Sequence, residues 1–446
     1  MRQYINLAVF FMFTLFSANS LATSVFFSNR TDQPIKIMFS YESNRIINEG
    51  NQFNTHSYDV QPYSRILIAE FNRYYGLKTG GIYNYYFEIS RQNESGEWTV
   101  DQDEPKPHLQ IVGNPTGSSI EYGFKNQTMI NNYQAYVIHD YGIDGDHNQY
   151  GVKALYTSNF YDVEFVIADH YVNDSEVKNT TLSIASYNLW MIPAVSSDIE
   201  ARVSHLPHNL SGYDVLALQE AFSGSRENLF DELEMEYFHS SGVIHGDNIN
   251  LYDGGIVTLS HYPILESDSV VFESCSGTDC YADKGVVYTK INKNGEIYHV
   301  FNTHLASFST NSAKRLRRIQ LILMRAFMLT KNIPDDEAVI YIGDFNIDKN
   351  GSPLEYQMML RVLEVDEPYY LGYIGATFEP GINQYAGQRF SGGATSEYLD
   401  YVFVSARHRK LIRNTNTVSL VQYVDNEIWG KWHLSDHFSV SGLLDF

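Results

Sequence analysis

The stretch VIYIGDFN, residues 339–346, joins a run of apolar, mostly β-branched residues to the polar pair Asp344 and Asn346. An apolar run of this kind predicts a buried strand, and the two polar residues follow where that strand ends. The sheet fixes the backbone at such a point while the strand tips stay open to ligand, so α/β proteins place their sites there. The stretch therefore predicts an α/β fold with a polar site at one edge of a sheet.

The same pattern recurs in other short segments of the C-terminal part of the chain. Apolar runs at 182–184, 215–218 and 297–301 precede three of them and predict further strands. The segments are SYNLW, LQE, THL, SDH and YLDYVFV, and they supply Asn188, Glu220, His304, Asp436, His437 and Asp400. Each segment alone is a weak signal, because an Asp or Asn at a strand end is usually a turn or cap residue. Their order and strand context together indicate a phosphodiesterase.

The residue types suggest how such an enzyme would work. One or two carboxylates, an amide oxygen and retained waters form a magnesium-like site, for which Glu220 and Asn188 are candidates. His437 follows Asp436, and a histidine held by a carboxylate such as Asp400 extracts a proton from water near neutral pH. The residues that could contact the phosphoryl oxygens as charge builds in the transition state are His304, Asp344 and Asn346.

Length and composition set the frame for these motifs. The chain has 446 residues, so two domains are expected, and a hydrophobic content of 43% is ample for packed cores. Arg2 is followed by an apolar run at 7–16 and by Ser20-Leu21-Ala22, which predicts a secretory signal peptide over residues 1–22, cleaved after Ala22. That run is too short to span a membrane, so we expect a secreted, extracellular protein.

Net charge and cysteine content bear on polyanion binding, on disulfide formation and on the possibility of a zinc site. The formal net charge of −22 argues mildly against tight, nonspecific binding to a polyanion such as DNA, although a basic groove or a metal could offset it locally. The two cysteines, Cys275 and Cys280, predict a disulfide in an exported protein, with two free thiols as the alternative. Two cysteines without paired histidines do not make a zinc site.

Residues 23–175 differ in texture from the rest, being dense in Tyr, Asn and Gly with short alternating runs. Such runs predict a β-sandwich, and they lie at 24–28, 35–41, 65–71 and 83–89. One polar loop could hold calcium, but a solvated turn is favoured for its residues Asp140, Asp144, Asp146 and His147. A polar stretch at 173–180 marks the boundary.

Residues 181–446 alternate strands with helices, and 312–330 is the clearest helix. The residues on its predicted apolar face are Leu316, Ile319, Leu323, Ala326 and Phe327. The basic run at 314–318 is expected to be a solvated face, with lipid headgroup contact as the alternative.

Three longer stretches carry a resemblance to a known family. They are DGGIVTLSHYPI at 253–264, ADKGVVYTKINKNG at 282–295 running into HVFNTHL, and EYLDYVFVS. With the motifs above, residues 181–446 resemble the endonuclease/exonuclease/phosphatase superfamily and, within it, the bacterial neutral sphingomyelinases C. The resemblance implies a catalytic phosphodiesterase domain with the DNase I-like four-layered α/β sandwich, preceded by a smaller β-rich accessory domain over 23–175. Residues 1–175 lie outside it, so a target- or membrane-binding role there is an expectation only.

The resemblance also implies a role for each site residue. Glu220 would bind the catalytic Mg²⁺ with help from Asn188, and Asp436 would support the metal or phosphate region. Mn²⁺ and Co²⁺ are alternative ions.

The remaining site residues would act on water and phosphate. Asp344 and Asn346 would orient the attacking water and the scissile phosphate. His304 would stabilise the pentavalent transition state. His437 would be the general base, held in its tautomer by Asp400.

The chain departs from the resemblance at a second metal site. Some sphingomyelinases bind a peripheral metal near two positions that are Gly224 and Tyr252 here, both poor ligands. Asp253 remains, but alone it does not predict that site.

A second departure concerns membrane contact. Members carry a long aromatic hairpin before SDH, and the corresponding stretch, 421–433, looks shorter here but keeps Trp429 and Trp432. We expect these tryptophans to contact membrane or substrate, because the ring is apolar while its N–H can stay wet. Ordinary packing is the alternative.

The sequence thus predicts a secreted, Mg²⁺-dependent phospholipase C-type hydrolase that cleaves sphingomyelin to ceramide and phosphocholine, a candidate haemolysin. Its expected partner is a sphingomyelin-containing membrane rather than nucleic acid. Two alternatives stay open. One is a secreted nuclease on the same fold. The other is a binding or toxin subunit whose N-terminal sandwich matters most and whose hydrolase core is vestigial.

Overall fold

The structure is a computed structural model that divides into two compact units, Met1–Tyr171 and Val172–Phe446. It describes residues 23–31, 33–45, 57–62, 64–71, 77–92, 97–100, 105–115, 117–131, 137–140, 149–156, 162–170, 180–246, 252–275, 277–372, 374–389, 395–423 and 431–446. The predicted signal peptide, the loop residues Asp144, Asp146 and His147, and Trp429 lie outside these ranges. No helix within the ranges is long and apolar enough to cross a membrane.

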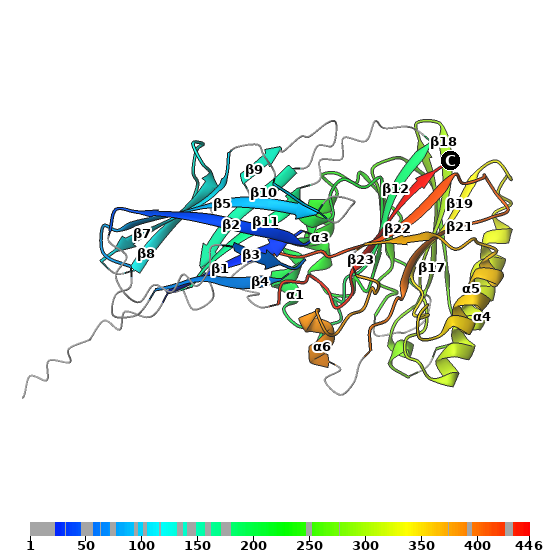
Figure 1. The fold of residues 1–446 in the computed structure, drawn as a ribbon. Coiled ribbons are helices and arrows are strands. Elements are labelled where there is room, and N and C mark those ends of the chain that lie inside the picture. Colours follow the sequence, from blue (N-terminus) through cyan, green and yellow to red (C-terminus); the bar gives the residue numbers. More distant parts are fainter. Residues whose placement is uncertain are drawn as a thin grey trace, which may run out of the picture. The chain divides into compact units, whose positions relative to one another are not determined.

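The first unit is built from two β-sheets (Figure 1). One has the order β4 (Arg65–Phe71), β1 (Thr23–Arg30), β11 (Val163–His170), β10 (Gln149–Tyr156) and β9 (Val137–Asp140). The other has the order β3 (Ser57–Val60), β2 (Ile35–Ser43), β5 (Ile82–Gln92), β7 (Pro107–Asn114) and β8 (Gly117–Phe124), and β6 (Trp98–Val100) pairs with β5.

Aromatic side chains from both sheets form the core of this unit. The ring of Phe87 on β5 stacks on Phe165 of β11 with centroids 4.8 Å apart, and it lies 5.1 Å from Phe27 of β1. Alternate residues of β2, such as Ile35 and Ile37, are buried while those between them are more exposed, as expected when one sheet face is covered. The predicted β-rich, sandwich-like unit is confirmed.

The second unit also contains two sheets, which face each other. The larger has the order β14 (His239–Ser240), β15 (Val257–Ser260), β13 (Val215–Gln219), β12 (Thr181–Asn188), β23 (Ser439–Asp445), β22 (Arg413–Ser419) and β20 (Tyr369–Leu371). The smaller has the order β16 (Ile264–Val271), β17 (Gly285–Lys293), β18 (Glu296–His304), β19 (Ala338–Asp344) and β21 (Asp400–Val404).

Helices cover the outer faces of both sheets. Leu206 and Leu229, from α2 (Leu206–Asn209) and α3 (Arg226–Leu233), share a core with Leu218 of β13, and α1 (Ile199–Val203) adds Val203. On the other side, α4 (Asn311–Thr330) packs the ring of Phe327 against β18, and α5 (Pro353–Leu363) lies beside α4 (Figure 1). Short helices η1 (Gly277–Tyr281) and α6 (Gln384–Arg389) lie in loops. This is the predicted four-layered α/β sandwich.

The buried face of α4 differs from the predicted one. Ile319 and Leu323 are 48% and 40% exposed, whereas Arg317, assigned to the solvated basic run, is 2% exposed. The Arg317 guanidinium is buried because it binds both carboxylate oxygens of Glu355 on α5, at 2.8 and 3.0 Å. A fully paired guanidinium is one of the few charged groups that a protein interior accepts, and apolar periodicity does not reveal the pairing.

A buried polar seam links the two sheets beside their strand ends. Gln219, the last residue of β13, donates from Nε2 to the Oδ1 of Asn302 on β18 at 2.8 Å. Asn302 in turn donates to the carbonyl oxygen of Val257 on β15 at 2.9 Å. Because unpaired amides would be costly in this position, the seam favours one relative placement of the sheets.

The predicted disulfide between Cys275 and Cys280 is present, with Cα atoms 5.1 Å apart. It closes a loop that contains Asp279, which enters the site described next.

Candidate active site

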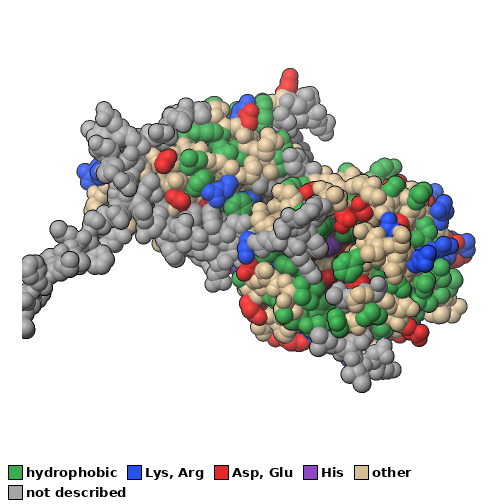
Figure 2. Space-filling model, turned by 90° about the horizontal axis from the view of Figure 1, so that it is seen from below, with side chains coloured by type: hydrophobic (Ala, Val, Ile, Leu, Met, Phe, Trp, Pro, Cys, Tyr) green, Lys and Arg blue, Asp and Glu red, His purple; other side chains and the backbone are tan. Residues whose placement is uncertain are grey.

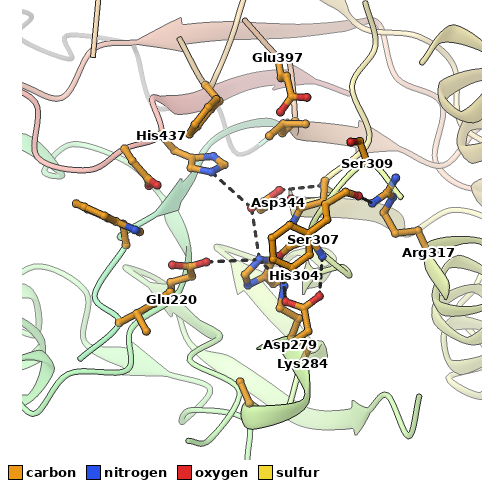
Figure 3. Close-up of a pocket in the computed structure, with 18 of the residues that line it drawn as sticks. Glu220, Asp279, Lys284, His304, Ser307, Ser309, Arg317, Asp344, Glu397 and His437 are labelled. Atoms are coloured by element: carbon orange, nitrogen blue, oxygen red, sulfur yellow. Dashed lines mark hydrogen bonds and ion pairs between the residues drawn. The ribbon is translucent and has the colours of Figure 1, made fainter. Parts of the chain in front are cut away.

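Strand ends from both sheets bring most of the predicted site residues together. Those that line one cleft are Glu220, His304, Asp344, Asn346, Asp436 and His437, and Asn188 and Asp400 contact members of this set from behind it. Asn188 ends β12 and Glu220 follows β13, while His304 ends β18 and Asp344 ends β19. Asp400 begins β21, where it pairs with Asp344 in the ladder. Asn188 pairs with the residue before Glu220, and His304 pairs with Asp344, so each pair lies at matching strand ends of its sheet. Figure 3 shows Glu220, His304 and Asp344 together in the pocket.

A histidine–carboxylate pair lies at one side of the cleft. His437 Nδ1 is 2.9 Å from Asp400 Oδ2, which assigns the proton to Nδ1 because an ionised carboxylate only accepts. The opposite nitrogen, Nε2, faces Asp344 Oδ2 at 3.9 Å. Burial lowers the pKa of His437, but the carboxylates of Asp400, Asp344 and Asp436 outweigh it and hold this pKa well above its ordinary value.

Two further carboxyl groups are crowded together. Burial, and then the charge of Asp436, raise the pKa of Glu220 to about 7. Burial, and then Asp400, raise the pKa of Asp344 to about 6. Glu220 Oε2 is buried and accepts no hydrogen bond from the described residues. Crowded carboxylates with an unsatisfied oxygen are the environment that a hard divalent cation stabilises.

The donor set therefore fits a divalent metal. Asp344, Asp400 and His437 offer ligand atoms within 4.8 Å of one another, but Asp400 and His437 already bind each other. Glu220, with its free oxygen, is the better first ligand. A cation there would offset the neighbouring carboxylates, and the pKa of His437 would then fall toward the range of a base near neutral pH.

Asn188 is placed to organise this set. Its Nδ2 donates to Asp344 Oδ2 at 3.0 Å, and its Oδ1 accepts the backbone N–H of Trp190 at 3.0 Å. Asp436 lines the cleft and is buried. The preceding Ser435 donates to the carbonyl oxygen of Asn188 at 2.6 Å and so ties the SDH segment to β12. The roles of Asn188 and Asp436 as metal ligands stay predictions.

Lys284 is a further site residue, which the sequence motifs did not predict. Its Nζ lies 3.0 Å from His304 Nε2, 3.0 Å from Asp279 Oδ1 and 2.7 Å from Ser307 Oγ, and the side chain lines the cleft. The only signal for it in the sequence is its position in the ADKGVVYTKINKNG stretch, which carries the family resemblance but does not indicate a role for this lysine. A buried ammonium at this point is suited to bind an anionic phosphate.

His304 and Asn346 occupy the floor of the cleft. Burial, and then Lys284, hold the pKa of His304 well below its ordinary value, so the ring is neutral and its Nε2 accepts from Lys284. Asn346 has a left-handed backbone with φ of 52°, and its N–H donates to Asp344 Oδ1 at 2.9 Å. Its Nδ2 donates to the carbonyl oxygen of Leu305 at 3.1 Å. Asn346 thus orients Asp344 and lines the cleft.

The cleft has a volume of about 1030 Å³ and a mixed lining. Figure 2 shows acidic and histidine side chains in a hollow of the second unit, with hydrophobic side chains close by. The apolar side chains among the lining residues are Trp190, Ile192, Pro193, Ala194, Val195, Phe222, Tyr252, Tyr281, Ala282, Phe308, Phe378 and Leu399. Three of these are well exposed, Val195 at 45%, Tyr281 at 58% and Phe308 at 51%.

The segment before SDH is described only at its two ends. Trp432 is 9% exposed, so its ring mainly packs, and Trp429 lies outside the described residues. Near the place considered for a peripheral metal, Asp253 Oδ2 accepts from Arg226 Nη1 at 2.6 Å. That carboxylate already has a cationic partner.

The known proteins that this chain resembles agree with one another in family and in fold. The sequence model of the Endonuclease/Exonuclease/phosphatase family matches residues 185–437. Sphingomyelinase C of Bacillus cereus is 32% identical over 258 residues, which cover 52% of this chain and 77% of that protein. Sphingomyelinase C 2 of Leptospira interrogans is 32% identical over 302 residues, 60% of this chain, and the match spans 46% of that longer protein. A crystal structure of a Staphylococcus aureus beta toxin mutant with bound magnesium ions is similar with a TM-score of 0.54, 29% identity, and coverage of 59% of this chain and 99% of that one.

Proposed function

Because this chain belongs to the Endonuclease/Exonuclease/phosphatase family and to its bacterial sphingomyelinase C branch, we propose that it is a secreted, Mg²⁺-dependent sphingomyelin phosphodiesterase. It hydrolyses sphingomyelin to ceramide and phosphocholine, and it is a candidate haemolysin. The single observation that carries this proposal is the cleft, in which a phosphodiesterase constellation is joined to exposed apolar side chains.

The lining of the cleft suits a lipid better than a nucleic acid. A lipid phosphodiester must be lifted partly out of a bilayer, which favours apolar and aromatic side chains beside the reacting groups, as Tyr281 and Phe308 are. A nuclease needs several free cationic groups along its groove, but Arg317 is paired with Glu355. Beyond Lys284 at the reacting phosphate, only Lys314 remains among the lysines and arginines of the described lining. The net charge of −22 also disfavours a polyanion.

The proposed metal site uses Glu220 as the main ligand, with Asp436 and Asn188 in support. The bound ion would act as a Lewis acid on the phosphate and its leaving oxygen. Lys284 and the neutral His304 lie next to this site, where they would stabilise negative charge on the phosphoryl oxygens.

The proposed base is His437. Its Nε2 takes a proton from water as that water attacks phosphorus, while Asp400 holds the Nδ1 proton. The bond between phosphorus and the ceramide oxygen breaks, and that oxygen takes a proton from solvent while His437 returns its proton to solvent. Ceramide leaves and phosphocholine remains as the second product.

The substrate class is tested directly by comparing two reactions in Mg²⁺. We expect the purified protein to release phosphocholine from sphingomyelin vesicles and to leave plasmid DNA intact under the same conditions. Chelation of the metal should abolish the release. Efficient DNA cleavage without phosphocholine release would instead establish the nuclease alternative.

The exposed aromatic side chains at the cleft should affect the hydrolysis of membrane-bound substrate but not of soluble substrate. The combined change Phe308→Gly and Tyr281→Ser is expected to lower vesicle hydrolysis by about tenfold, because it removes two rings that can enter the bilayer interface. Hydrolysis of a soluble phosphodiester should change little. Phe308 has a φ of 73°, which glycine adopts without strain, so the fold should tolerate the change.

Phe238→Ser is the matched control for this experiment, since Phe238 is exposed but does not line the cleft. It should leave vesicle hydrolysis unchanged. Equal losses on vesicles and on the soluble substrate would show that the two rings serve the chemistry rather than membrane contact.

A further inference from the structure

Glu397 is a carboxylate in the cleft that the chemistry above does not use. In Figure 3 it lies on the side of the pocket opposite Glu220, beyond His437. Within the described part of the chain, its side chain takes part in no hydrogen bond or ion pair. Burial, and then the charge of Asp348, raise the pKa of Glu397 above its ordinary value. The carboxylate therefore lies where its charge is poorly solvated.

None of the cationic groups along the described part of the cleft forms an ion pair with Glu397. Arg317 holds Glu355 with two hydrogen bonds and also donates to the carbonyl oxygen of Ala306 at 3.0 Å. Lys284 binds Asp279. His437 directs its Nδ1 proton to Asp400. Lys314 donates to Ser352 Oγ at 3.2 Å. Within the described residues, a cation in direct contact with Glu397 would thus have to come from a ligand.

The position of Glu397 is fixed by the segment that also supports the base. Glu397 and Phe378 form an antiparallel bridge, in which Glu397 N–H donates to the Phe378 carbonyl at 2.8 Å and Phe378 N–H donates back at 2.9 Å. The carbonyl oxygen of the adjacent Thr377 accepts the N–H of Phe438 at 2.7 Å. Glu397 is therefore held at a constant place relative to His437.

Two of the neighbouring lining residues are apolar, Phe378 and Leu399. The ring of Phe378 lies edge-on to the imidazole of His437, with centroids 5.6 Å apart, and Leu399 completes this wall. The aromatic ring and the aliphatic side chain beside this carboxylate offer no further oxygen or nitrogen acceptors. A primary ammonium or a guanidinium would leave donors unsatisfied there, whereas a quaternary ammonium has none to satisfy and spreads its charge over methyl groups that suit apolar contact.

We propose that Glu397, with Phe378 and Leu399, forms a subsite for the quaternary ammonium end of the substrate headgroup. The inference rests on the proposed function, which supplies a phosphodiester with a trimethylammonium group on one side. The subsite lies beside His437 and is separate from the Glu220 side of the cleft. Glu397 is then a specificity-determining residue, which selects headgroups that carry a fixed positive charge and no hydrogen-bond donor.

The test uses the full-length enzyme in Mg²⁺ with two soluble esters, p-nitrophenyl phosphocholine and methyl p-nitrophenyl phosphate. They share the leaving group and differ in the second ester group, which is cationic choline in one and neutral methyl in the other. The wild type should prefer the choline ester in kcat/KM. Glu397→Gln should reduce the ratio of the two kcat/KM values by about tenfold, mainly by raising KM for the choline ester, since a desolvated cation contact is lost. Glu397→Asp, which keeps the charge, should retain more of the ratio.

Asp366→Asn is the control of equal charge change, because Asp366 is exposed and does not line the cleft. It should leave the ratio unchanged. A binding readout comes from tetramethylammonium, which should inhibit cleavage of the choline ester competitively in the wild type and more weakly in Glu397→Gln. Lack of inhibition in the wild type would overturn the subsite without recourse to a variant.

Two other outcomes separate the possibilities. A fall in kcat of equal size for both esters in Glu397→Gln would place Glu397 in the chemistry and overturn the headgroup role. A wild type that prefers the choline ester but releases no phosphocholine from sphingomyelin vesicles would contradict the proposed lipid substrate and leave the subsite standing.

Discussion

Replacing His437 by alanine is expected to lower turnover by about 10²–10⁴-fold, the usual contribution of a positioned general base. The reason is geometric, since Nε2 is the nitrogen of the Asp400-bound ring that is left to accept a proton. The measurement is kcat on a soluble choline ester at saturating Mg²⁺. The melting temperature of the variant should fall, because the buried carboxylate of Asp400 loses its partner, and circular dichroism at the assay temperature checks that the variant is folded.

Asp400→Asn tests the same pair through its pH dependence. The carboxylate of Asp400 raises the pKa of His437, so its removal should lower that pKa and shift the acidic limb of the kcat/KM profile to lower pH. Maximal turnover should still fall, because an amide can hold the imidazole in the wrong tautomer. Full activity of Asp400→Asn with an unshifted profile would show that the pair is not the base.

Glu220→Gln is expected to raise the Mg²⁺ concentration needed for half-maximal activity by at least about 100-fold, since an amide carries no charge to hold the ion. The same change should increase the stability of the metal-free fold, although it weakens metal binding. Burial raises the pKa of Glu220 to about 7, so the ionised carboxylate destabilises the fold increasingly as pH rises from its unfolded value through about 7. At pH 8 without metal, the glutamine variant should therefore melt at a higher temperature than the wild type.

Thermal melting with and without Mg²⁺ separates metal binding from catalysis. Mg²⁺ should raise the melting temperature of the wild type and have little effect on Glu220→Gln, because only a bound ligand stabilises the folded state. His437→Ala provides the contrast, an inactive variant that should still be stabilised by Mg²⁺. Equal stabilisation of the wild type and Glu220→Gln would move the metal to other residues.

The sequence predicted which residues form the centre of the site because each of them is marked by a pattern within one short segment. Apolar runs that end in Asn188, Glu220, His304 and Asp344 can be read one at a time, and strands that share a sheet bring their ends together. The pairing of His437 with Asp400 could be predicted because it requires only that the strand of Asp400 lies next to the SDH segment. For these residues the pattern of single segments is enough to predict convergence, though not chemical role.

Other parts depended on contacts between distant segments and were missed or wrong. Lys284 sits just before β17 with no pattern of its own, and its role emerges only from its closeness to His304 and Asp279. The face of α4 was wrong because its burial is set by the Arg317–Glu355 pair, whose partners are 38 residues apart. Hydrophobic periodicity counts apolar residues and cannot see a paired charge.

The polar seam between the sheets has a consequence for how activity is lost. The reacting groups are shared between two sheets, with Glu220 following one and His304 ending the other, and Gln219 and Asn302 lock those sheets together one and two residues away. Unfolding of either sheet would break the seam and separate the proposed metal ligand Glu220 from the phosphate-binding groups. A partly unfolded second unit therefore has no residual activity. Catalysis and global cooperativity are thus coupled, and hydrolysis reports on the completeness of folding.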